Sequence, residues 1–284
     1  MKIALFDSAG NPVYSALEVA ALRIAIAGIV LMPVTIRSLK KINRSKWLSI
    51  LAIGVFGNML PAYLFTSAQT EIPSAIAGML NALTPLFTMI FAALVFKTII
   101  SIRQVSGLAI GLLGALMLAI GGDFERLGIE NDIEWWACSR VVLATLFYGF
   151  SVNILKNKLQ EVPSQAIAAI ALFFVLPPAT VVLAYSDVSS TLMNNPHGLN
   201  GMVAVVVLAA VGTAGALVLF NAIIKKTNAL TASSVTYIIP VFAAMWGWIY
   251  GEELTMIHLL GGAVILFGVA RVNGVGKKKV GHFN

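Results

Sequence analysis

The chain has 284 residues and a formal net charge of +7, and 59% of its residues are apolar while only 11% are charged. Its mean hydropathy of +0.91 exceeds what a water-soluble domain needs to build a core, so the composition excludes an ordinary soluble protein. The basic residues are dispersed in short loops without interleaved aromatic residues, which does not fit a nucleic-acid-binding face. Because Cys138 is the only cysteine, one chain cannot form a disulfide or a thiolate metal site.

Nine apolar segments predict nine membrane-spanning helices, since a helix of roughly 20 apolar residues crosses the hydrocarbon of a bilayer. Backbone amides in lipid must bond within the segment, and the alternating short strands of a barrel are missing from the pattern. We therefore predict an all-α membrane protein. In chain order the predicted spans are 16–36, 47–68, 73–96, 102–121, 135–155, 164–185, 201–223, 229–250 and 256–273.

The basic residues predict the orientation of these spans. If the loop after the first span is cytoplasmic, 15 of the 19 Lys and Arg residues fall in cytoplasmic loops or the tail, which satisfies the positive-inside rule. Five acidic residues gather in one outer loop, 122–134. We expect position 42 inside, position 190 outside and the basic tail, 274–284, in the cytoplasm.

The sequence contains an internal repeat. A shift of 155 residues, with one inserted residue before the last two pairs, superimposes Gly57 on Gly212, Leu64 on Leu219, Phe65 on Phe220, Ala77 on Ala232, Pro85 on Pro240, Phe87 on Phe242, Gly107 on Gly261 and Gly114 on Gly268. Matching segments have opposite predicted orientations, which is typical of an inverted-topology repeat. We predict one copy in 1–121, an outer connecting loop in 122–134 and a second copy in 135–273. The first copy has four spans and the second five, so we expect a helix to be missing at the front; the alternative is a true nine-helix protein.

Several short sequence motifs occur in a characteristic order along the chain. They are Ala20-Ala21-Leu22-Arg23 with Ala27-Gly28 and Pro33, the segment from Pro73 to Pro85, Thr227 to Ser233 before Pro240-Val241-Phe242, and Gly251 to Thr255 before Gly261 and Gly268. Through the order and spacing of these motifs, the whole chain resembles the EamA-type permeases of the drug/metabolite transporter superfamily. The resemblance implies ten helices in two inverted five-helix repeats, and an exporter of small metabolites or drugs in the bacterial inner membrane. The chain departs from that pattern in lacking the first helix.

Polar residues near mid-membrane are candidates for a substrate cavity, because a polar side chain in lipid must find a partner or water. The repeat aligns Asn58 with Thr213 and Asn81 with Thr236, which places hydrogen-bonding groups at equivalent depths in both copies. The alternative for each residue is a hydrogen bond between helices. The predicted cavity residues are Arg23, Asn58, Asn81, Tyr148, Thr213, Thr236, Tyr237 and Trp246.

Two arginines and two prolines within the predicted spans are further candidates for structural or functional roles. Arg23 lies roughly 10 Å along its helix and either meets an anionic substrate group or serves a structural role, by snorkelling or pairing. Arg140 follows an interfacial aromatic pair, and we expect it to form a surface ion pair. The matched prolines Pro85 and Pro240 are hinge candidates for alternating access, with a static kink as the alternative.

These features favour a secondary transporter that exports small metabolites or drugs by alternating access. All twelve acidic residues map to loops or helix ends, so a proton-coupling carboxylate would lie in the missing helix, or the protein is an exchanger or facilitator. A lipid scramblase or a structural membrane protein is the alternative, and an intramembrane enzyme is a more distant one because no nucleophile and base share a depth. We predict no cofactor and no metal site. The expected partners are a small-molecule substrate and the bilayer, with no nucleic acid, and the expected state is a monomer or homodimer.

Overall fold

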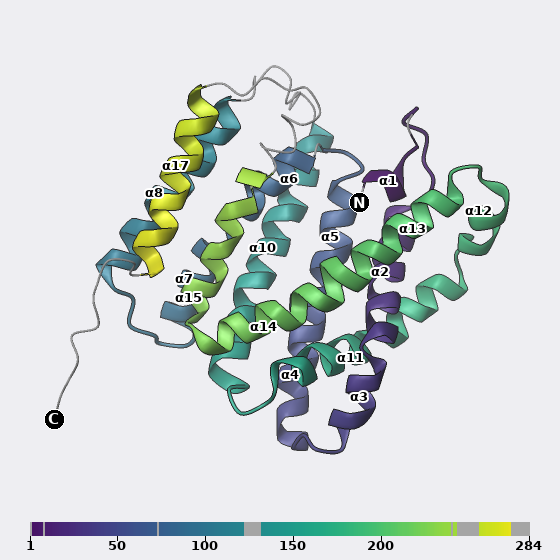
Figure 1. Cartoon of the computed structure of the whole chain (residues 1–284), viewed down its shortest axis with the longest axis horizontal. Helices are drawn as coiled ribbons and strands as arrows, with labels where there is room; N and C mark the ends of the chain where they lie inside the picture. Colours follow the sequence, from purple (N-terminus) through teal and green to yellow (C-terminus); the bar gives the residue numbers. More distant parts are fainter. Residues whose placement is uncertain are drawn as a thin grey trace.

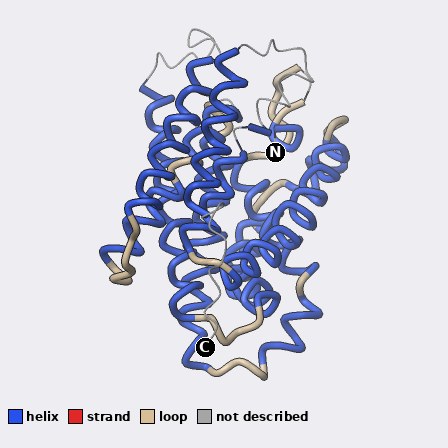
Figure 2. The backbone as a smooth tube through the Cα atoms, turned by 60° about the vertical axis from the view of Figure 1, so that its left-hand side comes forward, coloured by secondary structure: helices blue, strands red, loops and turns tan. Residues whose placement is uncertain are grey.

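The computed structural model describes residues 2–7, 9–72, 74–121, 132–239, 241–242 and 256–273. Within these ranges the chain consists of helices joined by loops and turns, and Figure 2 draws no strand there. A single isolated bridge joins Phe6 and Pro12 in the N-terminal segment. The predicted all-α class is confirmed.

Four described helical segments are long and apolar enough to cross a membrane. A fifth candidate is the pair Ala16–Val30 and Met32–Leu39, which is bent by 60°. Three shorter apolar helices lie elsewhere in the described ranges. The chain is therefore a multi-pass membrane protein, while the number of nine spans stays a prediction. The four long segments are Arg44–Ala68, Trp135–Lys158, Ser164–Ala184 and Gly198–Lys226.

The second helix of the first half, α2, has a capped start. The Ser15 side chain accepts a hydrogen bond from the Glu18 amide and the Glu18 carboxylate accepts one from the Ser15 amide, which fixes the start of α2. The elements of this half are α1 (Lys2–Leu5), α2 (Ala16–Val30), α3 (Met32–Leu39), η1 (Arg44–Lys46), α4 (Trp47–Gly54), η2 (Val55–Met59), α5 (Leu60–Ala68), α6 (Ser74–Asn81), α7 (Thr84–Leu94) and α8 (Ile102–Gly121).

The second half follows a similar order. Its elements are α10 (Asp132–Lys158), α11 (Ser164–Ala184), α12 (Val188–Asn194), α13 (Gly198–Ala209), η3 (Ala210–Gly215), α14 (Ala216–Lys226), α15 (Ala229–Ser233), η4 (Ser234–Tyr237) and α17 (Met256–Asn273). The long α10 packs against α4, α5, α6 and α7 of the first half, and α11 packs against α2 (Figure 1). The two halves therefore interdigitate instead of forming separate domains.

Two π-helical turns interrupt the long segments. They are η2 (Val55–Met59) and η3 (Ala210–Gly215), and their starting residues are 155 positions apart, which is the shift that aligns the sequence repeat. A π-turn leaves a helical carbonyl without its usual partner. Here Asn58 Nδ2 donates to the carbonyl of Ile53 over 3.0 Å, and Thr213 Oγ1 donates to the carbonyl of Leu208 over 3.2 Å. The two hydrogen bonds occupy equivalent places in the two halves.

Helices α8 and α17 lie side by side at one edge of the molecule (Figure 1). Their glycines let the backbones touch: a Cβ on Gly107 would lie 3.0 Å from the carbonyl oxygen of Gly268, and a Cβ on Gly114 would lie 2.8 Å from that of Gly261. Because the early part of α8 meets the late part of α17, the two helices run antiparallel. The sequence repeat aligns Gly107 with Gly261 and Gly114 with Gly268, and we call such aligned residues repeat-mates. Each of these two α8 glycines therefore contacts the repeat-mate of the other.

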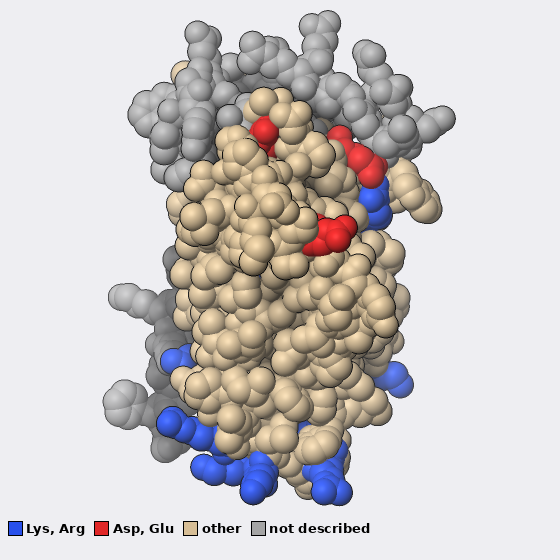
Figure 3. All heavy atoms as spheres, turned by 90° about the vertical axis from the view of Figure 1, so that its right-hand side faces the viewer, with Lys and Arg blue, Asp and Glu red and all other residues tan. Residues whose placement is uncertain are grey.

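The surface of the described helices suits a lipid environment. Large apolar side chains are exposed along α13 and its continuation, among them Val203, Val207 and Val211. On the face shown in Figure 3, most Lys and Arg residues gather at one end and Asp and Glu lie toward the other. This charge separation agrees in pattern with the predicted orientation.

Candidate functional site

A cavity of about 420 Å³ lies between elements of both halves. The first half contributes walls from α2, η2, α5, α6 and α7. The second half contributes walls from α10, α11, η3, α14 and η4. Most of the lining is apolar, and the polar groups are few. The polar side chains are Arg23, Asn58, Asn81, Thr84, Tyr148, Thr213 and Thr236.

The structure brings most of the predicted cavity residues together. Six of the eight line this one cavity, although they come from six different elements spread over more than 200 residues of sequence. Their roles in binding remain predictions. The six are Arg23, Asn58, Asn81, Tyr148, Thr213 and Thr236.

Tyr237 is placed outside the cavity. Its side chain is fully buried, its ring lies against Gly111 of α8, and its hydroxyl donates to the carbonyl of Leu108 over 3.2 Å. Thr236 and Tyr237 are neighbours in a 3-10 helix, where successive side chains diverge by about 120°. Only one of the two can face the cavity, and that one is Thr236.

Three predicted residues remain, and two of them are not among the described residues. Trp246 and Pro240 lie outside the described residues. Pro85 stands in the first turn of α7, directly after an interruption at residues 82–83 that separates α6 from α7. The helix is thus broken where a hinge was predicted, and movement at this point stays a prediction.

Arg23 is held by a chain of hydrogen bonds at one side of the cavity. Its Nε donates to Thr213 Oγ1 over 2.7 Å, and the same hydroxyl donates to the carbonyl of Leu208. Helix α2 packs against both η2 and η3, which places Arg23 next to the two π-turns. Among the described residues, neither terminal nitrogen of the guanidinium has a hydrogen-bond or ion-pair partner.

Thr84 lines the cavity at the start of α7 and was not among the predicted residues. Its hydroxyl donates to Asn81 Oδ1 over 3.2 Å and thereby orients the amide of a predicted residue. The available signal was the Thr84-Pro85 pair at a helix start, where a hydroxyl commonly bonds to nearby groups. Thr236 is oriented by a bond to the carbonyl of Ser233.

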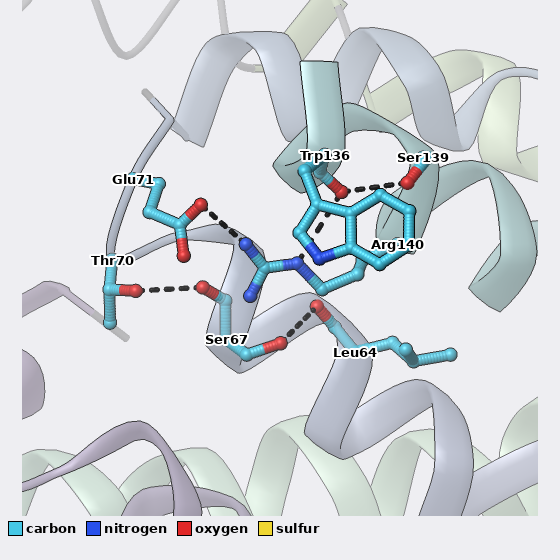
Figure 4. Close-up of polar contacts among 7 residues, drawn as sticks. All are labelled: Leu64, Ser67, Thr70, Glu71, Trp136, Ser139 and Arg140. Carbon is cyan, nitrogen blue, oxygen red and sulfur yellow. Dashed lines mark hydrogen bonds and ion pairs between the residues drawn. The ribbon is translucent and has the colours of Figure 1, made fainter. Parts of the chain in front are cut away.

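Arg140 lies apart from the cavity, in an ion pair with Glu71 (Figure 4). Arg140 Nη2 meets Glu71 Oε2, and Arg140 Nε donates to the carbonyl of Trp136 over 3.4 Å. The side chains of Arg140 and Glu71 are 20% and 29% exposed, so the pair is half-buried. The predicted ion pair is confirmed, and its partner comes from the linker between α5 and α6, in the first half of the chain.

The chemical groups of the described lining define what the cavity can bind. Within the described ranges no three His, Cys, Asp or Glu residues lie close enough together to hold a metal. The described lining contains one cation, one phenol, and amide and hydroxyl groups, without a carboxylate or imidazole. Such a set can bind a ligand through hydrogen bonds and charge.

Comparison with known proteins identifies the family. Residues 4–120 and 135–274 match the EamA-like transporter family. The chain belongs to the EamA-like transporter family. As an EamA-family protein, it is a transporter in class, and its relatives carry names of the same kind.

Three relatives illustrate the similarity. The chain is 27% identical over 259 residues to the "Uncharacterized inner membrane transporter YedA" of Escherichia coli (strain K12), covering 90% of this chain and 81% of the relative. It is 23% identical to the "Probable terminal-alkyne amino-acid exporter" of Streptantibioticus cattleyicolor, covering 91% of this chain and 82% of the relative. It is 22% identical to the "Probable amino-acid metabolite efflux pump" of Salmonella typhimurium, covering 73% of this chain and 70% of the relative.

A solved structure supports the fold. A crystal structure of a protein 18% identical to this chain superposes with a TM-score of 0.67, covering 91% of this chain and 87% of the other. At this identity the likeness concerns the fold alone.

Proposed function

We propose that this EamA-family protein is a secondary transporter that exports small metabolites by alternating access, with the cavity as its substrate site, in a bacterial inner membrane. The observation that carries the proposal is the pairing of polar groups across one cavity. Asn58 and Thr213 are repeat-mates and so are Asn81 and Thr236, and all four line the same space. A site at the interface of two repeats is where this class of transporter binds substrate.

An inverted repeat would supply the mechanism. The π-turns η2 and η3 and their side-chain-to-carbonyl hydrogen bonds recur at matched positions in the two halves. Helix α8 of the first half pairs with α17 of the second through glycines that the sequence repeat aligns. If an axis in the membrane plane relates the halves, an exchange of their conformations closes the cavity to one side and opens it to the other. The family match over two separate stretches agrees with this organisation.

Flux through the purified protein tests the proposal. One relative is named a probable terminal-alkyne amino-acid exporter and another a probable amino-acid metabolite efflux pump. Radiolabelled amino acids and amino-acid metabolites in proteoliposomes are therefore the first substrates to measure. We expect saturable flux that falls at least tenfold in Asn81→Leu and Thr236→Leu. Thr180→Leu is the matched control, because Thr180 is an exposed residue of α11 outside the cavity. Unaltered flux in both cavity variants would remove the proposed site.

The same vesicles separate the alternatives. A scramblase would move fluorescent lipid without saturation by any solute. An enzyme would change the substrate, whereas a transporter returns it chemically intact. We expect the labelled solute to be recovered unchanged and lipid translocation to match that of empty vesicles.

A further inference from the structure

We propose that the cavity selects small organic acids, with their carboxylate paired to Arg23 and their apolar body packed against the remaining walls. The inference rests on the proposed function, since it takes the cavity as the substrate site. It goes further in naming the charge and chemical class of the ligand.

Arg23 carries the only charge among the described residues that line the cavity. A cation at membrane depth is costly unless it pairs or meets water. No described carboxylate pairs with Arg23, which leaves a ligand anion as the natural counter-charge.

The orientation of Arg23 suits a carboxylate. Thr213 Oγ1 accepts the hydrogen bond from Nε and so fixes the plane of the guanidinium. The two terminal nitrogens keep their donors free of any partner among the described residues. A planar fork with two parallel N–H groups binds the two oxygens of a carboxylate together, with good geometry and charge assistance.

The acid closest along α2 is not available as a counter-charge. Glu18 lies five residues before Arg23, and its carboxylate accepts hydrogen bonds from the amide and the hydroxyl of Ser15 at the helix start. Glu18 does not line the cavity. A cationic ligand would therefore meet a like charge and no described carboxylate, so the cavity discriminates against organic cations.

The rest of the lining suits an apolar body of limited size. Leu172, Leu217, Phe220, Ile223 and Ile239 contribute aliphatic and aromatic surface. The volume of about 420 Å³ is in the lower range of small-ligand pockets. Neutral polar groups on Asn81 and Thr84 can bond a further substituent of the ligand.

Three compounds with one skeleton test the ligand class: 3-phenylpropionate, 3-phenylpropionamide and 3-phenylpropylamine. Binding is measured by calorimetry on the full chain in lipid nanodiscs. We expect the carboxylate to bind at least tenfold more tightly than the amide, and the amine to bind least. Equal affinities, tighter binding of the amine, or no binding of the carboxylate at millimolar concentration would overturn the proposal.

Variants assign the preference to Arg23. In Arg23→Gln we expect the affinity for 3-phenylpropionate to fall at least tenfold while that for the amide changes less than twofold. The matched control is Arg37→Gln, since Arg37 is an exposed arginine of α3 outside the cavity. If Arg23→Gln does not fold, Arg23→Lys keeps the charge without the fork, and a several-fold weaker carboxylate affinity supports the proposal. Carboxylate affinity equal to that of the unmodified chain in either variant contradicts it.

Flux measurements keep this inference separate from the proposed function. Saturable flux of the amine that depends on Thr236 and not on Arg23 would overturn the inference and leave the transporter standing. Arg23-dependent carboxylate binding without any flux would support the inference and count against transport.

Discussion

The hydroxyl of Thr213 holds two groups at once, the Nε of Arg23 and the carbonyl of Leu208. A hydrogen bond to a charged group contributes about 1.5–3 kcal/mol, so loss of this hydroxyl should release the guanidinium from its plane. We predict that Thr213→Val, which preserves shape, weakens 3-phenylpropionate binding about tenfold. Thr213→Ser keeps the hydroxyl and should bind within twofold of the unmodified chain. Equal calorimetric affinity for the Val and Ser variants would show that the bond does not position Arg23.

The ion pair between Glu71 and Arg140 joins the linker after α5 to α10. Because both side chains are partly exposed, solvent screens the attraction and the expected coupling energy is about 1 kcal/mol. A double-mutant cycle with Glu71→Gln, Arg140→Gln and the double variant measures this coupling through thermal unfolding in detergent. Additive effects of the two substitutions would mean that the pair contributes nothing to stability.

Individual cavity residues were predictable where chemistry and repeat agreed. An amide or hydroxyl at the same depth in both copies, as at Asn58 and Thr213, is rare enough in a span to indicate a common role. Tyr237 shows the limit, since the local change to a 3-10 helix turns it toward α8 and leaves Thr236 in the cavity. Thr84 was missed because its repeat position carries Ile239, which is apolar.

At the scale of elements, apolar length predicted where helices lie better than where they break. The predicted spans 164–185 and 256–273 correspond closely to α11 and α17. The span 73–96 is instead divided into α6 and α7, and 16–36 bends by 60°. A proline alone does not determine whether a helix breaks, because Pro177 and Pro178 lie inside an uninterrupted α11. The neighbouring helices determine whether freed carbonyls find new partners, and one sequence does not reveal those neighbours.

The π-turns were outside the reach of sequence analysis for a similar reason. A π-turn adds one residue to a helical turn and has no strong composition of its own. Its stabilisation here depends on Asn58 and Thr213, each bonding a carbonyl five residues earlier. We infer that both residues serve the helix geometry as well as the cavity.

The antiparallel α8–α17 pair depends on close backbone approach. A Cβ on Gly268 would lie 2.5 Å from the amide nitrogen of Gly111, whereas a Cβ on Gly262 of the same helix would meet nothing within 4 Å. We predict that Gly268→Ala destabilises the protein by about 1–3 kcal/mol through overpacking. Gly262→Ala is the matched control and should leave the unfolding temperature unchanged or slightly raised. Equal unfolding temperatures for the two variants, measured by intrinsic fluorescence, would argue against this packing.

At the scale of the whole molecule, the charge distribution predicts the orientation in the membrane. Ile42 lies in the linker between α3 and η1, and Ser190 lies in α12. In a Cys138→Ala background, we predict that Ser190→Cys reacts with an impermeant maleimide added to spheroplasts. Ile42→Cys should react only after the membrane is permeabilised. The reverse pattern would invert the proposed topology.

We propose that one cavity, shared by two halves, opens in turn to each side of the membrane. Cysteine accessibility at Thr236 tests it most directly, using Thr236→Cys with Cys138→Ala in oriented vesicles and an anionic, membrane-impermeant thiosulfonate. We expect reaction from either face, with 3-phenylpropionate slowing the reaction from both. Reaction from one face only, with and without the carboxylate, would contradict it.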